Sequence, residues 1–145
     1  MPCAKRIPPL IYYSAGLAKR RFDMFEIDIT RSFSAAHCLQ GYKGDCSALH
    51  GHNWTVQAVL NAEKLDQIGI AVDFKKLKQE LDAILDDYDH TNISELDEFK
   101  SINPTSEIIA QVIYRKLSAE MNDNNVKVAR IRVCESPASG ATYFE

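Results

Sequence analysis

Hydrophobic and polar residues alternate along two stretches in the first half of the chain. The first runs from Phe25 to Ala35, with apolar side chains at most odd positions and acidic or hydroxyl side chains between them. The second follows His50 and places apolar residues at even positions from Trp54 to Leu60. A period of two is typical of a strand with one buried face. These stretches therefore predict two β-strands, and residues 61–69 are expected to connect the second to the next element.

Two segments with helical spacing come next. Asp73 can cap a helix that runs to about Tyr88, because its carboxylate can accept hydrogen bonds from free backbone N–H groups. The apolar stripe expected on this helix is Phe74, Leu77, Leu81, Ile84, Leu85 and Tyr88. Asn103 and Pro104 are expected to open a second helix, which ends near 122–125. Its predicted buried face is Ile108, Ile109, Val112, Ile113 and Leu117.

Two more strands are predicted at 126–135 and 141–145, separated by turn-forming residues at 136–140. The order β-β-α-α-β-β indicates an α+β fold, with an antiparallel four-stranded sheet and two helices packed on one face. The other face of the sheet is polar, and its expected members are Asp28, Thr30, Ser32, Asn53, Thr55, Gln57, Arg130 and Arg132. Either a solvated surface or the wet interior of a barrel built from several subunits would explain that polarity.

The composition is that of one globular domain. The chain has 145 residues, of which 46% are hydrophobic and 26% charged. No apolar run approaches the roughly 18 residues that span a membrane. The net charge is −3. Nucleic acid is excluded as the main partner, because binding phosphates needs clustered basic residues.

The first 23 residues differ from the rest. They hold five basic residues and one acid, a net of +4, which leaves −7 for residues 24–145. Lys5-Arg6 and the fairly apolar stretch 7–18 suggest a secretory signal, but Pro8-Pro9 and two tyrosines argue against one. We therefore predict an N-terminal extension at 1–23, either a disordered tail or the product of an upstream start codon, and a domain at 24–145. The four cysteines form no CxxC pair, which favours reduced thiols in the cytoplasm.

Three of the four histidines form a candidate metal site. His50 and His52 are two residues apart, so in a strand both imidazoles point to the same side. His37 lies at the end of the first predicted strand and can supply a third nitrogen if the two strands pair. Three histidines with an open fourth position are typical of a catalytic zinc site, although an HxH pair alone is often incidental. Gly51 between them allows close approach of the backbone.

Cys46 precedes His50 by four residues and leaves three interpretations open. It could be a fourth ligand that closes a structural site. It could be a thiolate that acts on a bound substrate, since a nearby cation lowers the pKa of a thiol. It could also be a buried, inert cysteine.

Asp89, His90 and Glu135 each have both a structural and a chemical explanation, and Glu107 has a structural one. Asp89 beside His90 could form a proton relay, or His90 could simply end a helix. Glu107 suits the first turn of the second helix. Glu135 follows the apolar side of its strand, so it needs a partner such as a salt bridge or a pair of ligand donors.

Six stretches resemble the motifs of the 6-pyruvoyltetrahydropterin and 6-carboxytetrahydropterin synthase family, in the same order. They are Phe33–His37, Cys46–Asn53, Val72–Phe74, Asp89-His90, Asn103–Glu107 and Glu135–Pro137. Each motif is modest, but the ordered set is specific, and all four histidines fall on family positions. The resemblance covers nearly all of 24–145. It implies the tunnelling fold, with trimeric barrels stacked into hexamers and active sites at the seams between subunits.

The resemblance also implies a role for each candidate residue. The implied zinc ligands are His37, His50 and His52. The implied proton-transfer residues are Cys46 as the base and Asp89 with His90 as a relay. The residues implied to bind the pterin ring are Glu135 and Glu107, with Thr105 and Ser106 beside them.

The implied substrate is a small molecule, dihydroneopterin triphosphate, on which zinc would act as a Lewis acid. In the pyruvoyl branch of the family the reaction stops after triphosphate elimination and internal redox rearrangement. In the carboxy branch a carbon–carbon bond also breaks, acetaldehyde is released, and the product feeds queuosine and related deazapurines. Only three residues separate Cys46 from His50. This spacing resembles the bacterial carboxy type, whereas the animal pyruvoyl enzymes have a longer insertion.

Two other interpretations remain. One is a non-catalytic zinc-binding module in which Cys46 completes the metal shell. The other is a pterin enzyme of the same fold that acts on dihydroneopterin itself.

Overall fold

A computed structural model describes residues 24–145, so the predicted extension at 1–23 lies outside the described residues. The elements are β1 (Phe25–His37), β2 (His50–Ala62), α1 (Phe74–Asp86), α2 (Ser106–Met121), β3 (Val126–Ser136) and β4 (Ser139–Tyr143). Short 3-10 turns lie in the loops: η1 (Asp45–Ser47), η2 (Ile93–Glu95) and η3 (Asp97–Phe99). The predicted order β-β-α-α-β-β is confirmed.

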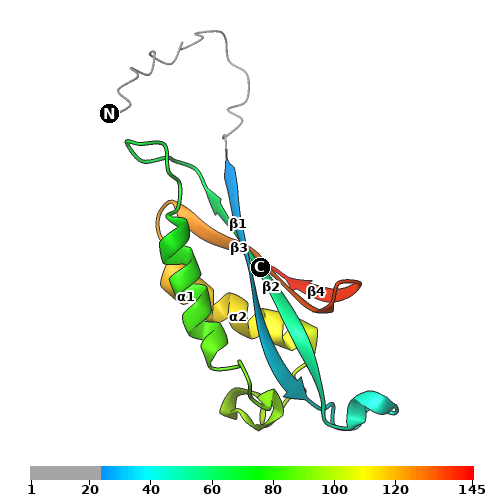
Figure 1. Cartoon of the computed structure of the whole chain (residues 1–145). Helices are drawn as coiled ribbons and strands as arrows, with labels where there is room; N and C mark the ends of the chain where they lie inside the picture. The colour runs from blue at the N-terminus through cyan, green and yellow to red at the C-terminus, as the bar shows by residue number, and fades with distance from the viewer. Residues whose placement is uncertain (1–23) are drawn as a thin grey trace, which may run out of the picture.

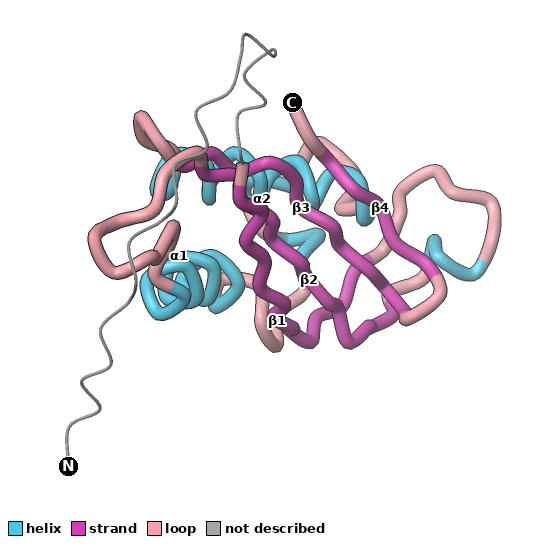
Figure 2. The backbone as a smooth tube through the Cα atoms, turned by 90° about the horizontal axis from the view of Figure 1, so that it is seen from above, coloured by secondary structure: helices cyan, strands magenta, loops and turns pink. Residues whose placement is uncertain are grey.

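The strands form one antiparallel sheet in the order β1-β2-β3-β4. Both helices cover the same face of this sheet, α1 beside β1 and α2 beside β3 and β4 (Figures 1 and 2). The predicted α+β architecture is therefore confirmed. β1 and β2 continue beyond the helices, and their far ends meet the loop that carries η1 and the loop between α1 and α2 (Figure 1).

The core lies between the sheet and the helices, and it contains most of the predicted apolar positions. Leu77, Leu81 and Ile113 are buried there with Trp54 of β2. Phe74 was expected in the core, but this was wrong, because its side chain is 52% exposed. It is the first residue of α1 and lines an apolar groove with Phe25 and other residues at the end of the sheet, outside the core.

The second helix begins later than predicted. Thr105 is its N-cap, with its hydroxyl accepting a hydrogen bond from the Ile108 amide at 3.4 Å. Asn103 was expected to be the cap. Its side-chain amide instead makes two hydrogen bonds with the backbone of Gln40, at 2.8 and 3.0 Å. A local pattern could not reveal that distant partner, which ties the start of α2 to the loop after β1.

The polar face predicted for the sheet is present. Thr30, Gln57 and Arg132 are neighbours across three strands on the side away from the helices. Glu26 accepts two hydrogen bonds from the Arg130 guanidinium, at 2.7 and 2.8 Å, so part of the face is neutralised within the chain. Within residues 24–145, no helix combines the length and the hydropathy that a membrane span requires.

Candidate metal centre and active site

Pairing of β1 with β2 brings the three candidate histidines together. His37 lies directly opposite His50, and His52 follows two positions along β2 on the same side. One potential ligand atom from each residue lies within 4.8 Å of the other two. The ring centroids are 4.6, 4.9 and 5.2 Å apart. The predicted set therefore converges at the end of the sheet.

Hydrogen bonds orient two of these rings toward a common point. Nδ1 of His37 bonds to the carbonyl oxygen of Pro104 and Nδ1 of His50 to that of Ala48, both at 2.8 Å. A neutral imidazole that donates through Nδ1 keeps a free lone pair on Nε2. The Nε2 atoms of His37 and His52 are both buried without a hydrogen-bond partner. Buried polar atoms rarely remain unpaired, so this donor set fits a metal ion bound through nitrogen.

Burial affects the ionisation of His37, whose side chain is only 1% exposed. The low polarity of its surroundings lowers its pKa below the ordinary value, although the Pro104 carbonyl opposes part of that effect. The ring is therefore neutral near pH 7, which is the form that binds metal.

This lowered pKa predicts an acid-sensitive metal-free protein. Below about pH 6.5 the unfolded chain protonates His37 while the folded chain does not, so the free energy of unfolding falls with decreasing pH until the folded pKa is reached. The slope from this one group is at most about 1.4 kcal/mol per pH unit. Urea unfolding of the metal-free protein at pH 7.5 and 5.5 checks this. The free energy of unfolding should fall less between the two pH values for His37→Gln than for the unsubstituted chain. An equal fall in both proteins would contradict a lowered pKa for His37.

Glu135 of β3 lies beside the histidines. Its Oε1 is 4.0 Å from Nε2 of His37 and accepts a hydrogen bond from the Ser106 hydroxyl at 3.3 Å. Its side chain is one-third exposed, so the carboxylate is open to a ligand. Of the residues predicted to bind the pterin ring, Ser106 and Glu135 therefore touch each other. Thr105 is used as the helix cap, and Glu107 is exposed on the first turn of α2.

Asp89 and His90 form a pair on the outer edge of β1. Oδ2 of Asp89 is 2.8 Å from Nδ1 of His90, and its Oδ1 accepts a hydrogen bond from the Ser34 amide at 2.8 Å. The Ser34 bond, together with the His90 contact, lowers the pKa of Asp89, so the carboxylate stays ionised. The His90 ring is otherwise open, with its side chain 82% exposed. This is the pair predicted for proton transfer.

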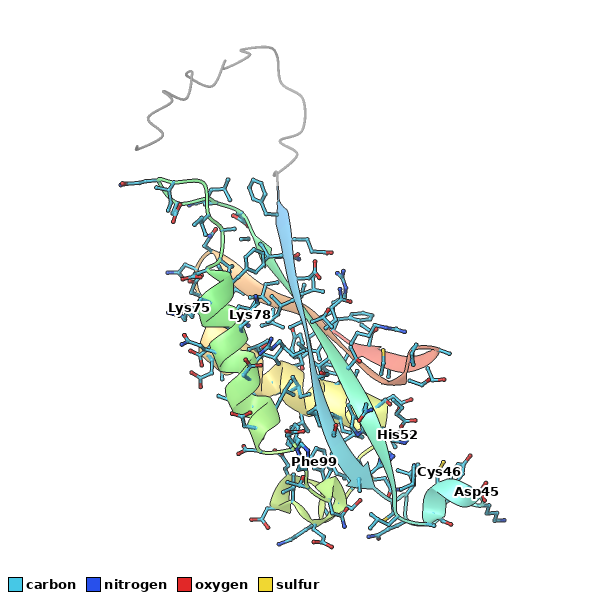
Figure 3. The ribbon with its side chains drawn as sticks, viewed as in Figure 1. Asp45, Cys46, His52, Lys75, Lys78 and Phe99 are labelled. Carbon is cyan, nitrogen blue, oxygen red and sulfur yellow. The ribbon has the colours of Figure 1, made fainter. Side chains whose placement is uncertain are left out.

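Cys46 lies outside the histidine group in the described chain. It belongs to η1, in the loop between β1 and β2, and is half-buried. Figure 3 shows Cys46 on η1, which projects beyond the end of the sheet. Within residues 24–145 the potential metal ligands that cluster are the three histidines alone. A single copy therefore does not support a fourth, cysteine ligand.

Three contributors to the site were missed from the sequence. Pro104 and Ala48 supply carbonyl oxygens that orient histidines, and backbone acceptors have no residue-type signature. Trp54 was assigned to the core. Its ring also lies 4.9 Å from His37 and 5.2 Å from His52, and its Nε1 donates to the Ala35 carbonyl at 3.2 Å. Its position two residues after His52 in the same strand was the available signal.

The fold and this site together define an α+β scaffold with three convergent histidines that could hold a metal ion. Residues 26–145 match the family model described as 6-pyruvoyl tetrahydropterin synthase. The chain therefore belongs to the 6-pyruvoyl tetrahydropterin synthase family, a family of enzymes.

Individual relatives extend over most of the chain. A 6-carboxy-5,6,7,8-tetrahydropterin synthase of Bacillus subtilis is 31% identical, with 82% of this chain and 84% of the relative covered. A dihydroneopterin monophosphate aldolase of Pyrococcus furiosus is 30% identical, with 75% and 88% covered. The solved structure of Caenorhabditis elegans 6-pyruvoyl tetrahydropterin synthase is 28% identical, has a TM-score of 0.77, and covers 88% of this chain and 99% of its own. The family resemblance and the tunnelling fold are thereby confirmed.

Proposed function

We propose that this protein is a zinc-dependent lyase that converts dihydroneopterin triphosphate and water into 6-carboxytetrahydropterin, acetaldehyde and triphosphate. The observation that carries the proposal is the convergence of His37, His50 and His52, with two buried Nε2 atoms unpaired, beside the open carboxylate of Glu135. A deazapurine pathway such as that of queuosine would use the product, and a cytoplasmic location would suit the free thiols.

Zinc held by the three histidines would supply Lewis-acid polarisation of the substrate's side-chain oxygens. Glu135 is suited to bind the pterin ring, because a carboxylate accepts two parallel N–H donors and Ser106 already fixes one of its oxygens. Thr105 and Glu107 lie next to Ser106 at the start of α2 and would complete that subsite.

Proton transfer would fall to the remaining candidates. The Cys46 thiolate would take a proton from carbon. His90 would donate protons to other atoms of the substrate. Asp89 would hold Nδ1 of His90 and stabilise the charged ring. In a single copy His90 lies on the outer edge of β1, whereas Cys46 lies in the loop between β1 and β2.

Assembly into a trimer or hexamer would bring such parts together at a seam between copies. Three features support an oligomer. The sheet has two outer strands, β1 and β4, and is not closed within one chain. No helix of residues 24–145 covers its polar face. Six large apolar side chains are exposed around the start of β1 and the β2–α1 connection: Met24, Phe25, Leu65, Ile68, Ile70 and Phe74. Exposed apolar patches of this kind mark contact surfaces.

The carboxy product is favoured over the pyruvoyl product by the short Cys46–His50 spacing and by the name of the Bacillus subtilis relative. The aldolase name of the Pyrococcus furiosus relative makes a third reaction, on a different substrate, worth testing.

The test is to incubate zinc-loaded protein with dihydroneopterin triphosphate and to measure acetaldehyde, triphosphate and the pterin product together. Equal amounts of acetaldehyde and 6-carboxytetrahydropterin would support the proposal. Triphosphate release without acetaldehyde would move the protein to the pyruvoyl branch. Turnover of dihydroneopterin or its monophosphate in place of the triphosphate would identify an aldolase. Zinc binding without turnover of any of them would leave a non-catalytic module.

A further inference from the structure

A polar cluster behind the Asp89-His90 turn has no part in the chemistry described above. The hydroxyl of Tyr88 donates to Oε1 of Glu98 at 2.7 Å, and Nζ of Lys116 lies 2.8 Å from the other carboxylate oxygen. The same ammonium group is 3.3 Å from the Tyr88 hydroxyl and 5.2 Å from the centre of its ring. The cluster therefore joins the turn after α1 to η3 and to α2.

Burial, aromatic packing and a hydrogen bond fix the position of the Tyr88 side chain. Its side chain is fully buried, and its ring packs against Phe33 and Phe99, with centroids 5.7 and 6.0 Å away. Burial, reinforced by the bond to Glu98, raises the pKa of its hydroxyl far above the ordinary value, so the group stays protonated and keeps donating. Hydrogen bonds to a charged acceptor are stronger than those between neutral groups.

The turn that follows Tyr88 depends on such support. His90 has a positive φ of 57°, and within residues 24–145 no other non-glycine residue does. Residues held in that region need surrounding contacts that fix them. On one side the contacts come from β1, where the His90 amide donates to the Ser34 carbonyl at 2.6 Å and the Ala36 amide donates to the Thr91 carbonyl at 2.9 Å.

On the other side the contacts come from Tyr88. The carbonyl oxygen of Tyr88 accepts hydrogen bonds from the amide and the hydroxyl of Thr91, at 3.2 and 2.7 Å. The Asp89-His90 pair thus lies between the edge of β1 and a tyrosine whose position is set by Glu98 and Lys116.

We infer that Tyr88, Glu98 and Lys116 are positioning residues that fix the orientation of Asp89 and His90 for proton transfer. The inference rests on the proposed function, because it takes Asp89 and His90 as the proton-transfer pair. Displacement of a reacting group by about 1 Å can cost as much as about 10²-fold in rate. Losing the Tyr88 hydroxyl bond should therefore slow turnover without weakening substrate binding or metal binding.

The principal variant is Tyr88→Phe, which keeps the ring between its aromatic neighbours and removes only the hydroxyl. Per metal-loaded site, kcat is expected to fall about tenfold or more, with KM and zinc content unchanged. Hydrogen exchange at the His90 amide should become faster. Tyr114→Phe is the matched control. Tyr114 is also buried and packs on an aromatic ring, that of Tyr143, but it lies away from the turn, so both readouts should stay at the parental values.

Two Glu98 variants separate positioning from stability. Glu98→Gln keeps an acceptor for the Tyr88 hydroxyl and should retain most of kcat, whereas Glu98→Ala should resemble Tyr88→Phe. A purely structural role would lower the melting temperature of Tyr88→Phe and Glu98→Ala but leave kcat per loaded site unchanged, and that result would overturn the inference. If the parent protein turns over no pterin substrate, the proposed function fails, and the exchange rate of the His90 amide alone decides whether the cluster holds the turn.

Discussion

Replacing His52 with alanine is expected to abolish stoichiometric zinc binding and to lower the rate of pterin turnover by about 10³-fold or more. Only two of the three protein ligands would then remain, whereas a catalytic zinc ion is usually held by three protein ligands. Lewis-acid stabilisation is worth several kcal/mol, and about 4 kcal/mol corresponds to a factor of 10³ in rate. Metal content measured by mass spectrometry, together with turnover of dihydroneopterin triphosphate, checks both parts of the expectation.

His90→Ala is the informative control, because His90 lies outside the group of potential metal ligands. His90→Ala should bind as much zinc as the parent, but its turnover of the pterin substrate should be slower than that of the parent. X-ray absorption of the parent should show nitrogen ligands and no zinc–sulfur distance near 2.3 Å. A sulfur ligand would revive the closed site with Cys46. One zinc retained per chain in His52→Ala would remove His52 from the metal site.

The elements of the fold could be predicted because their patterns are local. The period of two in β1 and β2 and the apolar stripe of α1 arise from which side chains face the core. The errors occur where distant contacts decide. Asn103 looks like a helix cap but bonds to Gln40, 63 residues earlier. Phe74 continues an apolar stripe but lies in a groove at the end of the sheet, where the described residues leave about half of its surface exposed.

The histidine cluster could also be predicted, since an HxH pair in a strand and a histidine at the end of its hairpin partner converge for geometric reasons. The surroundings of the cluster could not. Carbonyl oxygens of Pro104 and Ala48 orient the rings, and the approach of Glu135 to His37 depends on how β3 packs beside β2. The Tyr88 cluster could not be predicted from the sequence. Tyr88 continues the apolar stripe of α1, and the partners of its hydroxyl come from two other elements.

The cysteines provide the sharpest test of the proposed chemistry. Cys46→Ala should lower kcat by about 10²- to 10⁴-fold, the range expected when a positioned base is lost. Zinc content should not change, because Cys46 lies outside the histidine group. The rates of acetaldehyde and 6-carboxytetrahydropterin formation should fall together, since both depend on removal of the carbon-bound proton.

Cys38→Ala is the matched control for this variant. Cys38 is also half-buried and is the residue directly after His37, but its thiol faces the Ser94 hydroxyl at 3.7 Å. Its loss should leave turnover near the parental rate. If Cys46→Ala kept the parental rate while Cys38→Ala did not, the base would have been assigned to the wrong thiol. If both variants kept the parental rate, another group would have to remove the carbon-bound proton. Glu135 and Glu107 would then be the residues to substitute. The carboxylate of Glu135 is accessible beside the histidines, and that of Glu107 is exposed at the start of α2. The pair of variants therefore shows whether one of these two thiols is the base and, if so, which one.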